Sequence, residues 1–310
     1  MKTKPINKIL ISLGFIIAIA LITISSCKKE EVVGPAGPAG TDGTNGTDGT
    51  NGTNGTNATL VSATDQAAFD AANGLTGGRL YDAFMTQLGT TDTAITNHKD
   101  FFKCKQCHGW DLIGSNGSYI NRAPSATRPP VADNDLRVFS STHNIKQVFD
   151  AVKHTGGRNK TGPNSYINSL NGSMPDYSLI LTDAQVWEIT KFLKQEALNT
   201  FNLYDINTVG YYPTGTKTFT NIGKNGNAAN GNAVYAASCA SCHGADGTTI
   251  ALDGGTMYVG DFMRSNPPEF QHKARCGQPG TAMGSYSANN ESVVKDLLKA
   301  GQDTTAFPGF

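Results

Sequence analysis

The sequence predicts a mainly α-helical protein with two tandem helical domains, and three observations lead to this prediction. A five-residue motif of the pattern C-x-x-C-H occurs twice, at 104–108 and at 239–243. An amphipathic pattern follows Thr182, a suitable N-cap, and ends near Ala197. A second amphipathic pattern occupies 291–300. Each motif is followed at a distance by one predicted helix, which indicates a repeated unit.

The composition indicates a globular chain and excludes several other classes of protein. The chain has 310 residues and 38% hydrophobic residues, enough for one large or two small cores. The 25 basic and 25 acidic residues balance, which argues against nucleic acid as a partner. Six cysteines are too few for a disulfide scaffold in a chain of this length. The low charge of 16% and the 35 glycines place part of the chain outside any core.

Residues 1–26 are predicted to be a lipoprotein signal peptide. Three lysines precede an uncharged run from Ile9 to Ile24, which is short for a membrane span. The run leads into Ser25, Ser26 and Cys27, an ending that resembles a bacterial lipobox. Cys27 is therefore the expected lipidation site, and an uncleaved anchor is the alternative. The protein is expected on a membrane, facing the periplasm or the cell exterior.

The side of the membrane is indicated only by the charged residues after the anchor. Residues 28–31 read Lys-Lys-Glu-Glu and resemble the export tag of surface-displayed bacterial lipoproteins. This favours the outer membrane, with an ordinary solvated spacer as the alternative.

The glycine excess is concentrated in residues 27–59, which are predicted to form a stalk. From Gly34 to Asn57 a glycine recurs at every third position for eight triplets. This is the period of collagen, so a homotrimer through 34–57 is one expectation. A flexible hydrated linker is the other, because only the first two triplets contain proline.

The two C-x-x-C-H motifs match the attachment pattern of c-type haem. Two thiols on one helical turn add to the two haem vinyl groups, and the histidine that follows binds the iron. A zinc site or a redox dithiol would also use paired cysteines, but neither explains a histidine directly after each pair. The expected cofactors are two covalently attached haem c groups. The residues predicted to hold them are Cys104, Cys107, His108, Cys239, Cys242 and His243.

The order of motifs resembles the class I cytochrome c family. In both halves a methionine follows the attachment motif and an amphipathic helix closes the unit. The resemblance implies that Met174, which precedes a proline, and Met283, which precedes Gly284, bind the second face of each iron. It also implies that Gly231 and Tyr235 lie on a helix that crosses the last helix closely. A proline carbonyl is expected to accept the N–H of each haem-binding histidine, from Pro129-Pro130 and from Pro267-Pro268.

Other side chains remain candidates for these roles. Alternative iron ligands are His143 and His154 in the first half and Met257, Met263 and His272 in the second. Arg122, Arg128 and Arg137 are candidate partners of the haem propionates or solvated charges. Cys276 is either a buried apolar side chain or a ligand or redox thiol.

The predicted organisation is a cytochrome c-like domain at 60–200, a linker at 201–230 and a second such domain at 231–310. Because no catalytic constellation is present, the expected function is transfer of single electrons between membrane or periplasmic donors and an external acceptor. The expected partners are redox proteins or an extracellular acceptor. The alternative is a dihaem oxidoreductase, peroxidase-like or thiosulfate dehydrogenase-like, with one displaceable axial ligand. A third possibility is a structural role in which 34–57 trimerises a surface protein.

Overall fold

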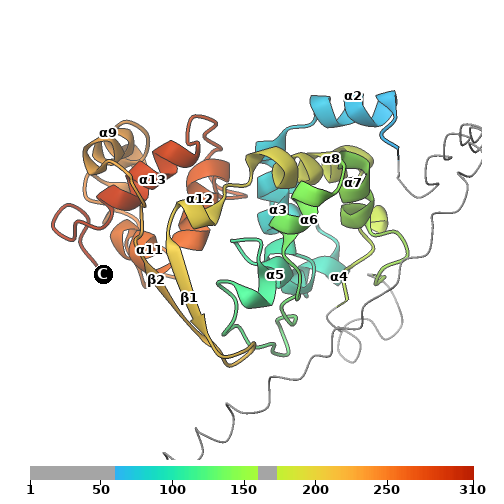
Figure 1. The fold of residues 1–310 in the computed structure, drawn as a ribbon, viewed down its shortest axis with the longest axis horizontal. Helices are drawn as coiled ribbons and strands as arrows, with labels where there is room; N and C mark the ends of the chain where they lie inside the picture. Colours follow the sequence, from blue (N-terminus) through green and yellow to red (C-terminus); the bar gives the residue numbers. More distant parts are fainter. Residues whose placement is uncertain (1–59, 160–172) are drawn as a thin grey trace, which may run out of the picture. The chain divides into compact units, whose positions relative to one another are not determined.

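The computed structural model describes residues 60–159 and 173–310 (Figure 1). The predicted signal peptide, the lipidation site Cys27 and the triplet stalk lie outside these residues. In the described ranges, no helix is both long enough and apolar enough to span a membrane.

The first half of the described chain is helical, as predicted. Its α-helices are α2 (Ala63–Ala71), α3 (Gly74–Leu88), α4 (Thr93–Thr96), α5 (Cys104–His108), α6 (Leu136–Thr142), α7 (Ile145–Lys153) and α8 (Asp183–Lys191). Short 3₁₀ turns lie at η1 (Lys99–Phe101), η2 (Gly114–Asn116), η3 (Tyr177–Leu179) and η5 (Thr200–Asn202), and α8 continues as a π-helical turn, η4 (Phe192–Glu196).

The helix predicted after Thr182 is present with its predicted ends. Thr182 is the N-cap of α8: its hydroxyl accepts the Gln185 N–H and its own N–H donates to the Gln185 side chain, which forms a capping box. The π-helical turn η4 ends at Glu196 and has Ala197 as its C-cap. Val186 and Ile189 of this helix are fully buried, which confirms the apolar face seen in the sequence.

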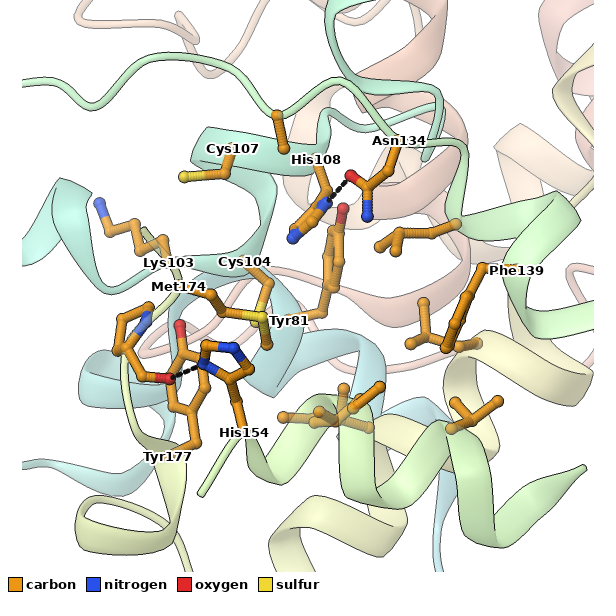
Figure 2. A pocket seen from close by; sticks show the side chains of 18 of the residues that line it. Tyr81, Lys103, Cys104, Cys107, His108, Asn134, Phe139, His154, Met174 and Tyr177 are labelled. Carbon is orange, nitrogen blue, oxygen red and sulfur yellow. Dashed lines mark hydrogen bonds between the residues drawn. The ribbon is translucent and has the colours of Figure 1, made fainter. Parts of the chain in front are cut away.

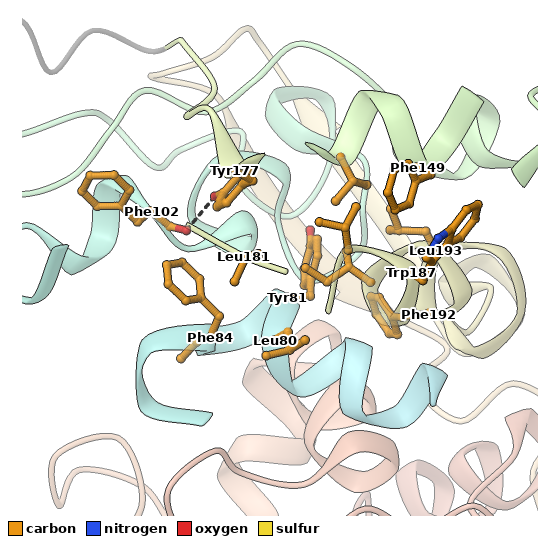
Figure 3. Packing of buried hydrophobic residues seen from close by; sticks show 14 of the residues in the cluster. Leu80, Tyr81, Phe84, Phe102, Phe149, Tyr177, Leu181, Trp187, Phe192 and Leu193 are labelled. Carbon is orange, nitrogen blue, oxygen red and sulfur yellow. Dashed lines mark hydrogen bonds between the residues drawn. The ribbon is translucent and has the colours of Figure 1, made fainter. Parts of the chain in front are cut away.

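Helix α3 was not predicted, although it is the main partner of α8. Gly77 lies where the two helices cross: a Cβ at this position would be 1.9 Å from the carbonyl oxygen of Glu188. Only glycine allows this approach. Tyr81, one turn later, packs in the first core beside Phe192, as Figure 3 shows, and its hydroxyl donates to the Gly109 carbonyl at 2.7 Å.

The second half repeats this arrangement with shorter elements. Its helices are α9 (Ala228–Ser238), α10 (Ala240–His243), α11 (Val259–Ser265), α12 (Pro267–Cys276) and α13 (Glu291–Ala300). Helix α13 has the predicted bounds. Gly231 of α9 faces α13 so closely that a Cβ would lie 2.0 Å from the Asp296 carbonyl oxygen. The Tyr235 hydroxyl donates to the Gly244 carbonyl at 3.1 Å. The expected close crossing is therefore present.

The segment predicted as a linker, 201–230, contains ordered structure. Strands β1 (Asp205–Val209) and β2 (Thr216–Thr220) form an antiparallel hairpin, with Asp205 opposite Thr220. The hairpin contacts the first half of the chain, because the Val131 N–H donates to the Tyr212 hydroxyl at 3.0 Å. The glycine- and threonine-rich composition resembles that of a linker, but it also suits strands with one exposed face and a tight turn.

Candidate functional site

Residues of the first motif line a cavity of about 380 Å³ (Figure 2). Its walls come from α3, α5, α6, α7, α8 and the segment that follows the undescribed gap. Most of the lining is apolar, and it includes Phe101, Leu136, Phe139, Val148, Val152, Ile189 and Leu193. A cavity with apolar walls and few polar groups is typical of a site for a large flat cofactor.

All three predicted attachment residues of this half reach the cavity. Cys104, Cys107 and His108 line it together from the single short helix α5. Burial raises the pKa of the Cys104 thiol to about 12 and that of Cys107 to about 11, so both are neutral thiols in the unmodified chain. Burial lowers the pKa of His108 to about 4, which leaves a neutral imidazole able to bind a metal.

The partner of the His108 ring differs from the expected proline carbonyl. His108 Nδ1 lies 3.0 Å from the side-chain oxygen of Asn134. An amide oxygen can accept the imidazole N–H as a carbonyl does, so the second nitrogen remains available to iron. Sequence reasoning missed Asn134 because it lies 26 residues from His108 and only the fold brings the two together.

Two candidate ligands lie on the far side of the first cavity. Met174 lines it, and so does His154, whose Nδ1 is 3.2 Å from the Pro175 carbonyl oxygen. Figure 2 shows both side chains across the cavity from His108 and Asn134. His143, the other histidine considered, instead stacks on Phe139 with ring centroids 4.1 Å apart and does not line the cavity. Met174 and His154 are thus both placed to face a bound group.

The second motif lines a separate cavity of about 300 Å³. Cys239, His243 and Met283 all reach it, whereas Cys242 lies on the same short helix but is exposed. The alternative ligands do not reach it. Met263 is fully buried in the second core and Met257 lines a different cleft.

His272, the remaining alternative ligand, also lies elsewhere: it packs against Trp110 with ring centroids 4.9 Å apart. The expected proline partner is again absent. His243 Nδ1 is buried and has no hydrogen-bond partner among the described residues, while the Pro268 carbonyl accepts from Gln271 at 2.9 Å.

The two cavities are connected by a buried ion cluster. Lys105, inside the first motif, lies 2.5 Å from one oxygen of Asp82 on α3. Lys273, which lines the second cavity, pairs with the other oxygen of Asp82. Both ammonium groups lie over the Trp110 ring, at 4.1 and 4.8 Å from its centroid. Burial opposes ionisation of Asp82, but the two lysines outweigh it and hold the pKa of this carboxyl below its usual value.

A second connection joins α3 to the loop that carries Met283. The Arg79 guanidinium donates to the Met283 carbonyl at 2.9 Å and to the Gln278 carbonyl at 3.1 Å. A residue of the first half therefore holds the loop that presents the candidate ligand of the second half. No motif in the sequence indicated this role.

Cys276 takes the packing role rather than that of a ligand. Its side chain is 1% exposed and belongs to the first hydrophobic core, although α12 is in the second half of the chain. A Cβ at Gly78 would lie 2.4 Å from its sulfur. Cys276 lines neither of the two cavities. Burial raises the pKa of its thiol to about 12, so it is not a thiolate at neutral pH.

Two family models match the chain. Residues 95–197 match the model described as cytochrome c, and residues 226–297 match the model described as cytochrome C oxidase, cbb3-type, subunit III. Searches of curated proteins and of solved structures gave no match. The two matched segments contain the two C-x-x-C-H motifs, and together with the helical fold they support a mainly α-helical protein of the cytochrome c family.

The residues present fit covalent haem c. In each cavity the motif histidine and a methionine line a mostly apolar space, together with both cysteines of the first motif and with Cys239 of the second. Thiol, imidazole and thioether are the donors that c-type haem uses. The matches and the donors imply covalently bound haem c with its iron, and they indicate a haem-based electron-transfer protein.

Proposed function

We propose that this protein is a dihaem c-type cytochrome that passes single electrons between membrane or periplasmic donors and an external acceptor. In this proposal Cys104, Cys107 and His108 hold one haem, and the equivalent residues of the second motif hold the other. Each haem supplies one-electron chemistry at its iron.

The observation that carries the proposal is the presence of a methionine in both cavities. Met174 and Met283 each line the cavity of their own motif. A thioether sixth ligand leaves no open coordination position and favours electron transfer over catalysis at the metal. The chain itself provides mostly apolar walls around both motif histidines, and Asn134 orients the ring of His108.

The ferric absorption spectrum of the holoprotein tests the proposal. Two haems per chain and a thioether–iron band at the red end of the visible spectrum are expected. Met283→Ala removes the part of the band that belongs to the second haem. Met174→Ala removes the part of the band that belongs to the first haem. Because His154 also faces the first cavity, comparison with the variant Met174→Ala/His154→Ala shows whether His154 binds the iron once Met174 is absent.

A high-spin ferric haem in the unaltered protein would contradict this function. It would favour the alternative, a peroxidase-like or thiosulfate dehydrogenase-like oxidoreductase with a displaceable sixth ligand. Measured turnover of peroxide or thiosulfate would then be required to assign the reaction.

We also propose that Cys27 anchors the protein in a membrane, with the haem domains facing the periplasm or the exterior. The support is the signal-like segment 1–26 and its lipobox-like ending. Cys27→Ser is expected to move the haem absorbance from the membrane fraction to the soluble fraction. Retention of this variant in the membrane would indicate an uncleaved anchor instead.

The triplet segment 34–57 is proposed to act as a spacer between anchor and haem domains, and its glycine period allows a homotrimer. Gel filtration of the protein without its lipid, with and without 34–57, separates the two cases. If both proteins elute as monomers, trimerisation through this segment is excluded.

A further inference from the structure

A polar cleft of about 560 Å³ lies beside both haem cavities and belongs to neither of the sites described above. Lys105 and Gln106 of the first attachment helix line one part of it. Asp253 and Glu269 line it as well, and these two residues also line the second haem cavity. The cleft therefore adjoins the second cavity and reaches the outer side of the first attachment helix.

Three cations of this cleft form no ion pair with a carboxylate of the described residues. Arg122 donates to the Gln106 carbonyl at 3.0 Å, and Arg128 donates from Nε to the Ala123 carbonyl at 2.9 Å. Lys217, on the hairpin strand β2, donates to the Ser118 carbonyl. Within residues 60–159 and 173–310, none of the three forms an ion pair with a carboxylate.

Four carboxylates either act on Arg122 or Lys217 or line the cleft, and three of them have other partners. Asp100 pairs with Lys103 at 2.8 Å, and Asp111 is buried and accepts the Ser118 N–H at 2.6 Å. Glu269 accepts from Asn266 at 2.9 Å and lies in the field of Lys105 and Lys273. Asp253 is the remaining acidic residue of the cleft, so the cleft keeps an excess of positive charge.

All three cations line the same cleft. Burial is the main cause that lowers the pKa of Arg122 and of Lys217, and the charges of Arg128 and Arg122, respectively, lower it further, while the fields of Tyr119 and Asp111 oppose the shift. Like charges gathered around a half-buried polar space repel each other unless an anion enters. The Arg122 guanidinium is further oriented by the Tyr119 ring, 4.7 Å away.

We propose that Arg122, Arg128 and Lys217 form a binding site for an oxyanion group in the cleft between the two haem cavities. Guanidinium and ammonium groups bind carboxylates and inorganic oxyanions by charge-assisted hydrogen bonds. Two sources supply such a group: a free inorganic oxyanion, or a propionate of the haem in the adjoining second cavity. Arg122 and Arg128, which were considered as propionate partners of the first haem, do not line its cavity.

The first arm of the test measures free-anion binding to the holoprotein. Sulfate is titrated calorimetrically at constant ionic strength into the unaltered protein and into Arg128→Gln/Lys217→Gln. Arg122 is retained because it holds Gln106 inside the attachment motif. The control Lys146→Gln/Lys153→Gln removes two charges that pair with Asp150 and Asp183 and do not line the cleft. A free-anion site predicts binding about tenfold weaker in the cleft variant only.

The second arm measures the midpoint potentials of both haems, assigned with Met174→Ala and Met283→Ala. If a propionate occupies the site, sulfate does not bind, and the cleft variant lowers the potential of the second haem relative to the control variant. The physical reason is that lost positive charge destabilises the reduced, more negative state.

The proposal is overturned if sulfate does not bind and the potentials of the cleft variant equal those of the control. The second arm rests on the proposed dihaem function, whereas the first does not. Haem content is measured beforehand, so a protein with one haem is recognised as a failure of the proposed function and not of the anion site.

Discussion

At the scale of the residue, Asp82 joins the two halves of the chain between the two candidate haem cavities. Its carboxylate is 1% exposed and is shared by Lys105 and Lys273, one from each half of the chain. A buried carboxylate with two ammonium partners is tolerated because both of its oxygens are satisfied. Removing its charge takes away the ion-pair partner that both buried lysines share.

Asp82→Asn is expected to lower the free energy of unfolding by about 3 kcal/mol for this reason. The control is Asp150→Asn, which disrupts an exposed pair with Lys146 and should cost less than about 1 kcal/mol. Denaturant unfolding at pH 7 measures both. Equal effects of the two substitutions would show that the buried cluster adds nothing beyond a surface pair.

The same carboxyl gives a pH dependence of known sign. Because the folded-state pKa of Asp82 is below its usual value of 3.8, its stabilisation is present above that value. It is lost as the pH falls through the lower, folded-state pKa. The stability difference between the unaltered protein and Asp82→Asn should therefore be constant near neutrality and shrink below about pH 4. A difference that persists unchanged in acid would exclude this origin.

At the scale of elements, the two halves share one device. A glycine on the first long helix of each half, Gly77 or Gly231, lies against a carbonyl of the closing helix, and a tyrosine one turn later bonds to the glycine after the motif. In the second half the tyrosine lies four residues before Cys239, so the sequence showed the device. In the first half, Tyr81 lies 23 residues before Cys104. The longer segment between them, which contains α4, separates the tyrosine from the motif, so the sequence did not indicate the pair.

Gly77→Ala and Gly231→Ala are expected to destabilise the protein by about 1–3 kcal/mol each, because the new methyl group overlaps backbone atoms that cannot move aside. Gly284→Ala is the matched control, since no atom lies within 4 Å of the Cβ position there. Thermal and denaturant unfolding measure all three. A small effect at Gly77 or Gly231 would mean that the helices separate at little cost.

Arg79 gives a prediction on the loop between α12 and α13. Its fork of donors holds the carbonyls of Gln278 and Met283, and lysine cannot reproduce this geometry. Arg79→Ala and Arg79→Lys should both weaken the thioether–iron band of the second haem and leave that of the first unchanged. A purely structural role would lower stability without this selective spectral change.

At the scale of the molecule, the described residues form one compact unit rather than two separate domains joined by a linker. Helix α12 has one face on the second haem cavity, through Phe270 and Lys273, and places Cys276 in the first core. The hairpin from the predicted linker bonds to Val131. Electrons exchanged between the proposed haems would thus cross a fixed, packed boundary.

Unfolding of the holoprotein should accordingly be a single transition. Both tryptophans, Trp110 and Trp187, lie in the first half, so their emission reports on that half, and the Met283–iron band reports on the other. The two probes should give coincident denaturation curves. Two separate midpoints would show that the halves are independently stable and that the contact between them is weak.

The sequence by itself determined what depends on local order along the chain. The N-cap at Thr182 and the bounds of the last helix follow from spacing and periodicity, and the same reasoning predicts the haem attachment residues and the methionine ligand of each half. These features hold because one helical turn or one amphipathic face requires particular residues at fixed intervals.

Only the tertiary structure decided which distant groups meet. It placed Asn134 rather than a proline at His108, His154 beside Met174, and Arg79 and Asp82 of one half against the loop and helix of the other. It also gave Cys276 a packing role and turned a linker-like segment into a hairpin. Such pairings carry no signal in a single sequence, because burial and charge compensation depend on which surfaces the fold brings together.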